Sequence, residues 1–544
     1  MDRRQAIKVL GSLTVAGAVH QALAGVGAIG RAVGIARSGS ASWQLPAGHY
    51  VTSAIPLQII GPRSGATGSN PYGKWYTGMS MALPVLVMGG AFPFHFALSG
   101  TYPTGTTIGA DLDWAQWNST SPMGGTNADY GVITCSSPAA GTYSPTVTVT
   151  DQAGTQVSVT WTLTITTTGF VFIDSVNGSA SGPNGGTGTG TISAPFKTLN
   201  DVYAGATGGV SHATIADATY QGDFIILRAG TYATNACYLN ATGLVAWQTN
   251  KPMAIIGYPG ETAALDFTGA QLDEAGGTTQ GFWIHSVGFN NIGAGSNYQG
   301  IRWDSGLTDQ LLYNCQIGTM TGPSSSVNPA WLMSDSAAPN ITQYMAVSRC
   351  AFAGVSTNAV ELFELYDSEN ILVEYNSVSN NISGGAGFYF KQGNRLFQVR
   401  GNYGSTGNGS VLCRYDNMDA TITQGTDADI SWNNYQTTSQ ALAFGTFGNN
   451  WGSVSLGRNT WQAEWCEIAA TTGTGSGTIT VTGDVNIGNG TYTNNWYESS
   501  FSGTLTLGTD YLTGTSATAI VDANGDLQGT YRTNYLGLSG HEIA

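Results

Sequence analysis

Four cationic side chains lie close together in a chain that has few of them. The segment FYFKQGNRLFQVRGN, Phe388 to Asn402, contains Lys391, Arg395 and Arg400, and Arg414 follows in VLCRYDN. The 544 residues include only 18 Lys and Arg against 33 Asp and Glu, so the formal net charge is -15. A local cationic site in an acidic protein is suited to holding an acidic ligand against the net field of the chain.

The alternation of the aromatic strand predicts which side chains face outward. Period two places Phe388 and Phe390 on one face, expected to be the core, and Tyr389 with Lys391 on the other. Aligning FKQGN with CRYDN stacks Arg414 on Lys391. In a uronic-acid polymer a base can remove the proton beside the sugar carboxylate, while a cation neutralises that carboxylate and an acid assists the leaving oxygen. Lysine and arginine together can fill these roles.

Carboxylates precede the lysine. The stretch VELFELYDSEN supplies Glu361, Glu364 and Asp367, and RWDSGLTD supplies Asp304. Three or four carboxylates near a base could bind Ca²⁺ through their oxygens or act as the acid and base of a hydrolase. Solvated charges at turn corners are the alternative, because no spacing here is diagnostic.

Composition excludes two classes of function. The charged fraction is 9%, and no basic face exists to hold nucleic acid. Beyond the N-terminus no apolar run approaches the roughly 18 residues that would span a bilayer, so we expect no membrane span in the mature chain. The 14 Trp, 25 Tyr and 18 Phe supply ample surface to bury, unlike the composition of disordered chains. We therefore expect a large, folded, mainly β protein.

A column of similar short phrases predicts a repeating fold. The phrases YNCQI, SRCAF, EYNSV, RGNYG, NNYQT and GRNTW are anchored at Cys315, Cys350, Asn376, Asn402, Asn434 and Asn459. The steps between anchors are 35, 26, 26, 32 and 25 residues, and the two longest steps mark loop insertions. A coil of this length with three short strands cannot bury its apolar face alone and is stabilised by stacking on its neighbours. Asparagines in one column can then hydrogen-bond along the stack.

The same column contains two cysteines. Neighbouring coils lie about 4.8 Å apart, inside the roughly 4.4 to 6.8 Å window for disulfide-bonded Cα atoms. Cys315 and Cys350 could therefore be bonded or merely stacked. None of the six cysteines forms a CxxC or a Cys/His zinc spacing, so we expect no structural zinc.

The N-terminal residues 1–24 are similar to a twin-arginine export signal. Arg3 and Arg4 precede a weakly apolar stretch that ends in Ala22-Leu23-Ala24, a small-x-small site. Export implies a periplasmic or extracellular protein. The alternative is an N-terminal helix that anchors the protein in a virion or cell-surface assembly.

Two further segments indicate the domain organisation. From about Pro84 to Thr168 the sequence alternates polar with β-branched residues, with a hairpin turn expected at Asp151 to Gly154. This segment resembles the immunoglobulin-like modules of bacterial secreted proteins. The expected organisation is residues 1–24 as signal or anchor, 25–83 as linker and irregular lead-in, 84–168 as an Ig-like β-sandwich, and 169–544 as a solenoid with a C-terminal cap.

After Gly169 the order of strand, glycine loop, short helix and strand resembles the opening of right-handed parallel β-helix proteins of the pectate-lyase-like superfamily. The residues that carry the resemblance are Asp174, Gly178, Pro195, Phe196, Thr198, Gly222, Asp223, Arg228, Gly230 and Tyr232. The fold class expected is thus all-β, a right-handed parallel β-helix preceded by an Ig-like β-sandwich. Such a fold presents a long ridged face that suits an extended polymer, and polysaccharide is the natural ligand.

A lysine on one coil with an arginine on the next resembles the catalytic pair of polysaccharide lyase family six, whose members cleave alginate and dermatan or chondroitin chains. The resemblance implies Lys391 as base and Arg414 as acid. Those enzymes carry calcium-binding glutamates before the lysine, where this chain has Gly384 to Gly387. They have histidine after the arginine, where this chain has Tyr415.

These observations predict an exported protein that binds an extended acidic polysaccharide and cleaves it by β-elimination, with a glycoside hydrolase as second choice. The predicted substrate-binding residues are Tyr389, Arg395, Arg400, Tyr415 and Asp304. The predicted ligands, should the site use Ca²⁺, are Glu361, Glu364 and Asp367. The runner-up is a non-catalytic surface adhesin or viral tailspike-type component.

Two of the arginines have a structural alternative. Arg395 and Arg400 could pair with Glu369 and Glu374 on the neighbouring coil, as exposed charges often do.

Overall fold

The computed structural model divides the chain into two compact units, Met1–Leu45 and Pro46–Ala544. The structure describes residues 43–45, 50–63, 71–113, 125–180, 185–199, 201, 223–233, 253–268, 272–274, 280–292, 301–304, 307–318, 332–335, 341–353, 361–379, 386–391, 393–406, 411–417, 426–437, 440–446, 451–462, 465–470, 478–482, 485–486, 495–499 and 504–507. The predicted export signal lies outside these residues, and the elements below all belong to the second unit. No helix within the described ranges has the length and apolarity needed to cross a membrane.

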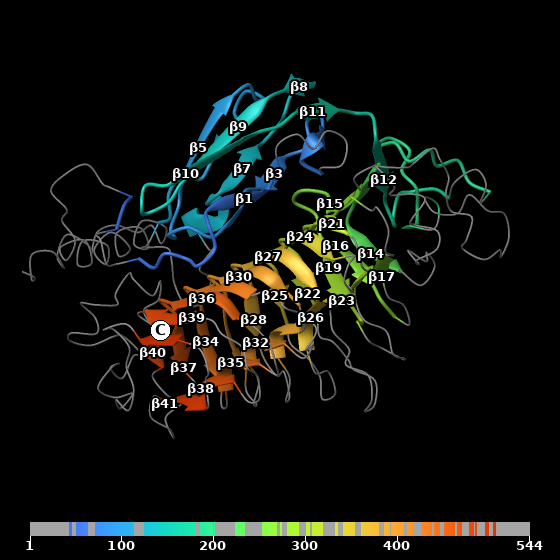
Figure 1. Ribbon diagram of the computed structural model, residues 1–544. Coiled ribbons are helices and arrows are strands. Elements are labelled where there is room, and N and C mark those ends of the chain that lie inside the picture. Colours follow the sequence, from blue (N-terminus) through green and yellow to red (C-terminus); the bar gives the residue numbers. More distant parts are fainter. Residues whose placement is uncertain are drawn as a thin grey trace, which may run out of the picture. The chain divides into compact units, whose positions relative to one another are not determined.

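From β12 onward the described strands are assigned in turn to three parallel sheets, which together form a parallel β-helix (Figure 1). The twelve-stranded sheet consists of β12 (Phe170–Ile173), β13 (Phe224–Leu227), β15 (Met253–Gly257), β18 (Gln280–His285), β21 (Thr308–Tyr313), β24 (Thr342–Ser348), β27 (Ser368–Glu374), β30 (Arg395–Arg400), β33 (Thr426–Ser431), β36 (Trp451–Gly457), β39 (Thr478–Thr482) and β42 (Thr504–Leu507).

The ten-stranded sheet consists of β14 (Gly230–Ala233), β16 (Ala263–Asp266), β19 (Gly288–Asn290), β22 (Gln316–Ile317), β25 (Ala351–Phe352), β28 (Ser377–Ser379), β31 (Tyr403–Thr406), β34 (Asn434–Thr437), β37 (Thr460–Gln462) and β40 (Val485–Asn486). The nine-stranded sheet consists of β17 (Leu272–Glu274), β20 (Ile301–Asp304), β23 (Leu332–Asp335), β26 (Glu361–Tyr366), β29 (Ala386–Lys391), β32 (Val411–Asn417), β35 (Gln440–Thr446), β38 (Trp465–Ala470) and β41 (Asn495–Ser499). The prediction of an all-β chain with parallel strands from about Gly169 is confirmed.

The core of the β-helix is filled by alternate residues of all three sheets. In the nine-stranded sheet Phe388 and Phe390 are fully buried, as the alternation predicted. Phe390 stacks on Phe397 of β30, with ring centroids 4.3 Å apart and an interplanar angle of 15°. These aromatic contacts join the nine-stranded sheet to the twelve-stranded sheet through the interior.

A ladder of buried asparagines sets the register between coils. Asn402 Oδ1 accepts hydrogen bonds from the backbone N and from Nδ2 of Asn376, both at 2.9 Å. Asn402 Nδ2 in turn donates to Val373 O at 3.0 Å and to Asn433 Oδ1 at 3.0 Å. Asn433 repeats the same contacts with Asn459. Each buried amide is therefore fully bonded to the coils on either side.

The ladder corrects one anchor of the sequence column. Asn433 is the ladder residue, and its neighbour Asn434 begins β34 with a half-buried side chain. The reason is local. The residue before each ladder asparagine adopts the left-handed conformation, with φ of 56° at Tyr375 and 61° at Trp432. This turn, rather than the strand that follows it, fixes which asparagine points along the stack.

The two cysteines of the column are stacked thiols and not a disulfide. Cys315 and Cys350 are both free and buried. The backbone N of Cys350 donates to Asn376 Oδ1 at 2.8 Å, so this cysteine occupies the same position of the coil as the asparagines. Burial and the neighbouring Cys315 raise the pKa of the Cys350 thiol well above its usual value.

Short sheets precede the β-helix. A two-stranded sheet pairs β1 (Gln58–Gly61) with β4 (Leu86–Met88). The three-stranded sheets, in spatial order, are β10 (Gln156–Thr160) with β9 (Pro145–Thr150) and β5 (His95–Gly100); β2 (Lys74–Tyr76) with β11 (Leu163–Thr166) and β8 (Gly141–Tyr143); and β3 (Met81–Pro84) with β7 (Val132–Cys135) and β6 (Thr107–Ile108). Two 3-10 helices, η1 (Pro71–Gly73) and η2 (Gly125–Asp129), lie among these strands. We call these elements the N-terminal sheets.

The expected hairpin turn is present between β9 and β10. Asp151 exchanges backbone hydrogen bonds with the turn, and its Oδ1 accepts from Thr155 N at 2.8 Å. Gly154 has a φ of 85°, a conformation that suits glycine.

The N-terminal sheets pack on the outer face of the twelve-stranded sheet. Arg400 donates to Val87 O at 2.9 Å, and Gln398 Oε1 accepts from Gly89 N at 3.1 Å. Arg349 donates to Tyr130 O at 2.5 Å. Further ring contacts and ion pairs join the two parts, including Tyr72 with Trp283, Phe92 with Trp432, and Arg63 with Asp309. This face is therefore covered from β18 to the end of β33.

We predict that replacing Asn402 with alanine weakens the stack. The substitution leaves buried donors of Asn376 and the carbonyl of Val373 without partners, and each such group costs about 1 to 3 kcal/mol. The free energy of unfolding, measured by denaturant titration, should fall by about 2 to 4 kcal/mol. The matched control is Asn434→Ala, which removes a half-buried amide outside the ladder and should change it by less than about 0.5 kcal/mol. Equal effects would show that the ladder does not set the stability of the coil.

We predict an acid-sensitive contact at His285. Its Nε2 lies 2.8 Å from Ala82 O in the N-terminal sheets, and burial lowers its pKa from 6.5 to about 4. Below pH 6.5 the imidazole of His285 is protonated in the unfolded chain but stays neutral in the folded chain. The free energy of unfolding therefore decreases as the pH falls from 6.5 to 4. The loss approaches about 3 kcal/mol across this window.

The measurement is the unfolding free energy from pH 7 to pH 4, for the wild type and for His285→Gln. The variant should lose less stability on acidification. Burial raises the pKa of Asp309 and of Asp429, whose contributions have the opposite sign but are common to both proteins. Parallel pH profiles for the two proteins would contradict the prediction.

Candidate functional site

The four cations singled out in the sequence lie on two different sheets. Lys391 ends β29 and Arg414 lies in β32, both in the nine-stranded sheet. Arg395 and Arg400 begin and end β30 in the twelve-stranded sheet. The fold therefore does not gather all four into one site.

Lys391 belongs to a buried polar cluster with Glu364, Tyr366 and Tyr389. Its Nζ donates to Glu364 Oε1, and Tyr366 Oη donates to the same oxygen at 2.7 Å. The ammonium also lies over the Tyr389 ring, 4.4 Å from the centroid. Glu364 is 2% exposed and Lys391 9%, so the charges are paired away from solvent. In this arrangement Lys391 is hydrogen-bonded to a carboxylate, and separating a buried pair of this kind is costly.

The backbone register around this cluster differs from the predicted alignment. Arg414 lies beside Tyr389, and Asp416 lies beside Lys391. The prediction that Arg414 stacks directly on Lys391 is thus wrong by two residues, although the two residues do occupy adjacent coils. In the observed register the inward pairs are Phe388 with Cys413 and Phe390 with Tyr415. A slip of two residues keeps the same side chains inward, so alternation in the sequence could not distinguish the two registers.

Several predicted substrate-binding residues lie away from an outer surface. Tyr415 is 1% exposed and stacks on Phe397, with ring centroids 5.5 Å apart. Tyr389 is 5% exposed beneath the ammonium of Lys391. Asp304 aligns with Asp335 of the next strand, and its side chain lies outside the described residues, as does that of Arg414.

The arginines of β30 make the pairs that the structural alternative predicted. Arg400 donates to Glu374 at 2.6 Å, and both are almost fully buried. Burial alone would lower the pKa of Arg400, but Tyr375 and Glu374 outweigh it and raise the pKa. Arg395 lies 3.8 Å from Glu369 and is only half-buried. Arg400 thus joins the β-helix to the N-terminal sheets and is not open to a polymer.

The predicted calcium ligands do not form a site among the described residues. Glu364 accepts from Lys391 and Tyr366, Asp367 is buried after β26, and the side chain of Glu361 lies outside the described residues. No group of three or more His, Cys, Asp or Glu side chains in the described part of the chain could hold a metal ion. Because the side chain of Glu361 is not described, the predicted calcium site of Glu361, Glu364 and Asp367 stays a prediction.

A groove lies on the outer face of the ten-stranded sheet, which sequence reasoning did not predict. It has a volume of about 510 Å³ and crosses the strands β14, β16, β19, β22 and β25. Its floor is the outward column Thr231, Ala264, Gly288, Gln316 and Ala351, aligned by the parallel register. Strands spaced by about 4.8 Å give the groove a length of about 19 Å.

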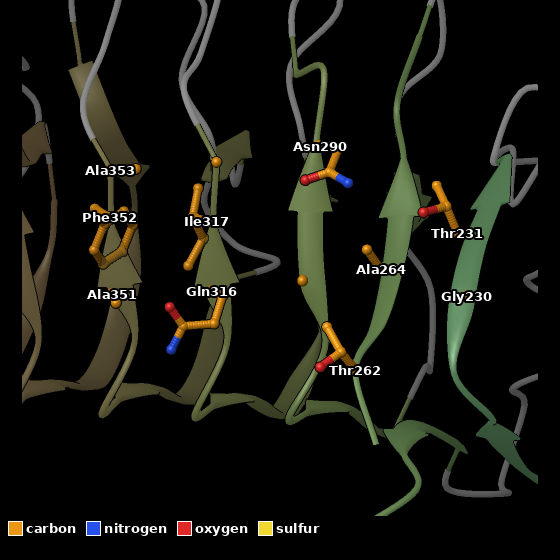
Figure 2. A pocket seen from close by; sticks show the side chains of 12 residues that line it. Gly230, Thr231, Thr262, Ala264, Asn290, Gln316, Ile317, Ala351, Phe352 and Ala353 are labelled. Carbon is orange, nitrogen blue, oxygen red and sulfur yellow. The ribbon is translucent and has the colours of Figure 1, made fainter. Parts of the chain in front are cut away.

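Small side chains keep the floor of the groove low. Gly288 has no Cβ, and one built there would lie 3.2 Å from the Cβ of Ala264. Exposed polar side chains of Thr231, Asn290 and Gln316 rise from neighbouring strands along the groove (Figure 2). None of the residues that line it carries a charge. The groove offers hydroxyl and amide groups that both donate and accept hydrogen bonds, beside apolar surface.

A sequence signal for the groove exists, but it depends on the register. In AALD, GFN and CQI the outward residue lies immediately before a buried Leu265, Phe289 or Ile317. The alignment of these three short strands follows from the register between coils and not from their sequences alone. Small residues in short strands resemble ordinary turn sequence until then.

Comparison with protein-family models, with curated proteins and with solved structures found no match for this chain.

Proposed function

We propose that this protein binds an extended polysaccharide along its β-helix, with the groove on the ten-stranded sheet as the binding surface. The observation that carries the proposal is an open groove, lined by uncharged polar and apolar residues, that crosses five successive coils. At about 4.8 Å per strand the groove is about 19 Å long. A linear polymer can contact every coil in turn, whereas a compact ligand would leave most of this length empty.

The shape of the sheet supports a glycan over a peptide. Each interior strand of the sheet is paired with a strand on both sides, so the floor has no free edge for an added peptide strand. The groups that remain are side-chain hydroxyls and amides, which match the mixed donor and acceptor character of sugar hydroxyls.

The wider classification is part of the same proposal. The β-helix is right-handed and of the pectate-lyase-like type, and the N-terminal sheets form an Ig-like module. Three parallel sheets built from successive strands support the former, and the β9–β10 hairpin supports the latter. An experimental structure with left-handed coils would overturn the first assignment.

Export to the periplasm or cell exterior follows from the twin-arginine pattern, and a virion or cell-surface assembly is the alternative. Mass spectrometry of the native protein separates them. A mature chain that begins near Gly25 supports export, and a retained Met1 favours assembly.

We predict that Ala351→Trp blocks the groove. Ala351 points outward at one end of the floor, where an indole would occupy the path of the polymer. Binding of a polysaccharide identified by affinity electrophoresis should weaken by more than about tenfold, equal to about 1.4 kcal/mol. The control is Asn434→Trp, in the same outward column but three strands beyond β25. Equal affinities of the wild type and Ala351→Trp would place the ligand elsewhere.

A second candidate function is cleavage of an acidic polysaccharide by β-elimination. The observation that favours it is the polar cluster of Lys391, Glu364, Tyr366 and Tyr389, because buried titratable groups of this kind are frequent at active sites. Lys391 would act as base and Arg414 as acid, after substrate binding separates Lys391 from Glu364. A glycoside hydrolase is the alternative chemistry for the same carboxylates.

For this second function we predict that Lys391→Ala and Arg414→Ala abolish the rise in ultraviolet absorbance from unsaturated sugar ends. Alginate, pectate, chondroitin and ulvan are the substrates to test. Because Lys391→Ala leaves a buried carboxylate unpaired, Lys391→Arg serves as a variant that keeps the pair and the fold. Lys197→Ala, an exposed lysine outside the cluster, is the control. If the wild type produces neither unsaturated ends nor new reducing ends, the hypothesis of catalysis is wrong.

A further inference from the structure

The groove lacks the positive charge that the acidic ligand expected from the sequence would require. The chain carries a net charge of -15, and the groove contributes no lysine, arginine or histidine to offset it. A polyanion would approach a negative protein with no cation to receive it. The charge balance therefore disfavours an acidic polymer on this face.

Three of the described cations are paired with carboxylates elsewhere in the structure. Lys391 pairs with Glu364 in the nine-stranded sheet, and Arg400 pairs with Glu374 beneath the N-terminal sheets. Arg228, near the first strand of the groove, makes two hydrogen bonds of 2.9 Å and one of 2.5 Å to Glu261. None of the three belongs to the groove lining.

The lining itself is complementary to an uncharged sugar chain. Thr231, Asn290 and Gln316 present neutral polar groups, while Ala264 beside Thr231 and Ala351 beside Gln316 present methyl surface. Hydroxyl and amide groups satisfy sugar hydroxyls, and methyl groups can contact the C–H faces of the rings. A carboxylate or sulfate on each sugar would lose hydration here without gaining an ion pair.

We propose that the groove of the ten-stranded sheet is a site for a neutral, linear polysaccharide. The inference rests on the proposed function, since it names the class of polymer that the same groove binds. It assigns to this face a ligand different from the acidic substrate of the nine-stranded sheet. Gln316 is the specificity-determining residue, because its amide stands in the outward column between the small residues Gly288 and Ala351.

The test is a binding panel with the full chain. The neutral polymers are dextran, mixed-linkage β-glucan, galactomannan and xylan, and the acidic ones are alginate, pectate and chondroitin sulfate. Gelatin represents extended peptides. Affinity electrophoresis selects the ligands, and calorimetry gives their affinities between 50 mM and 500 mM salt. A neutral polymer should bind with an affinity that changes less than about twofold over this salt range, because no ion pair is screened.

Variants locate the site. Gln316→Ala should weaken binding of the neutral polymer by about threefold to tenfold through a lost hydrogen bond, whereas Gln316→Glu should keep that binding within about threefold. Asn434→Ala removes an amide from the same column outside the groove and should leave the affinity unchanged. Circular dichroism and thermal unfolding of each variant establish that the fold is retained.

The outcomes separate the two proposals. If only acidic polymers bind, with salt-dependent affinity reduced by Ala351→Trp, the neutral class is overturned while polysaccharide binding in the groove stands. If gelatin alone binds there, the ligand is a peptide and both proposals fail. If no member of the panel is affected by Ala351→Trp, the groove is not a polymer site.

Discussion

The register between successive coils is the constraint on which the rest of the structure depends. In a parallel β-helix a slip of one residue would exchange the core face and the surface face of a strand. Here the register is set at one corner, where a left-handed residue precedes a buried asparagine whose amide bonds both neighbouring coils. A buried amide has no partners of equal quality in a slipped register, so the ladder disfavours slippage. In the coils that carry the ladder, from Cys350 to Asn459, the surface columns take their alignment from this corner.

The N-terminal sheets decide which face of the β-helix can meet a ligand. They cover the twelve-stranded sheet through aromatic contacts and through polar ones, in which Arg400, Gln398 and Arg349 reach backbone carbonyl and amide groups of the N-terminal sheets. Polar groups buried in this way require defined partners, so the contact is specific in its geometry. Over the described residues, the groove of the ten-stranded sheet lies outside this covered face.

Charge placement distinguishes two faces of the β-helix. The outward side of the nine-stranded sheet has a paired lysine and glutamate, with two tyrosines beside them. The groove of the ten-stranded sheet has neutral side chains only. An acidic and a neutral polymer would therefore be distinguished by which sheet they contact, and the two surfaces can be tested independently.

The sequence by itself determined the all-β class, the parallel stacking after Gly169 and the burial of Phe388 and Phe390, because these follow from local alternation and from a repeat of about 26 residues. It also determined that Arg395 and Arg400 could pair with Glu369 and Glu374, one repeat earlier. The identity of Asn433 as the ladder residue was not determined, since two adjacent asparagines satisfy the pattern equally.

Only the tertiary structure decided which residues are accessible. Arg400 is an outward residue of its own strand, yet it is buried because sheets more than 300 residues earlier in the chain pack over it. Lys391 donates a hydrogen bond to Glu364 because the register of the inward aromatic residues brings these two side chains together. The groove arises because small residues from five short, separate strands fall into one column. Each of these features depends on contacts between distant segments, which local patterns in a sequence do not specify.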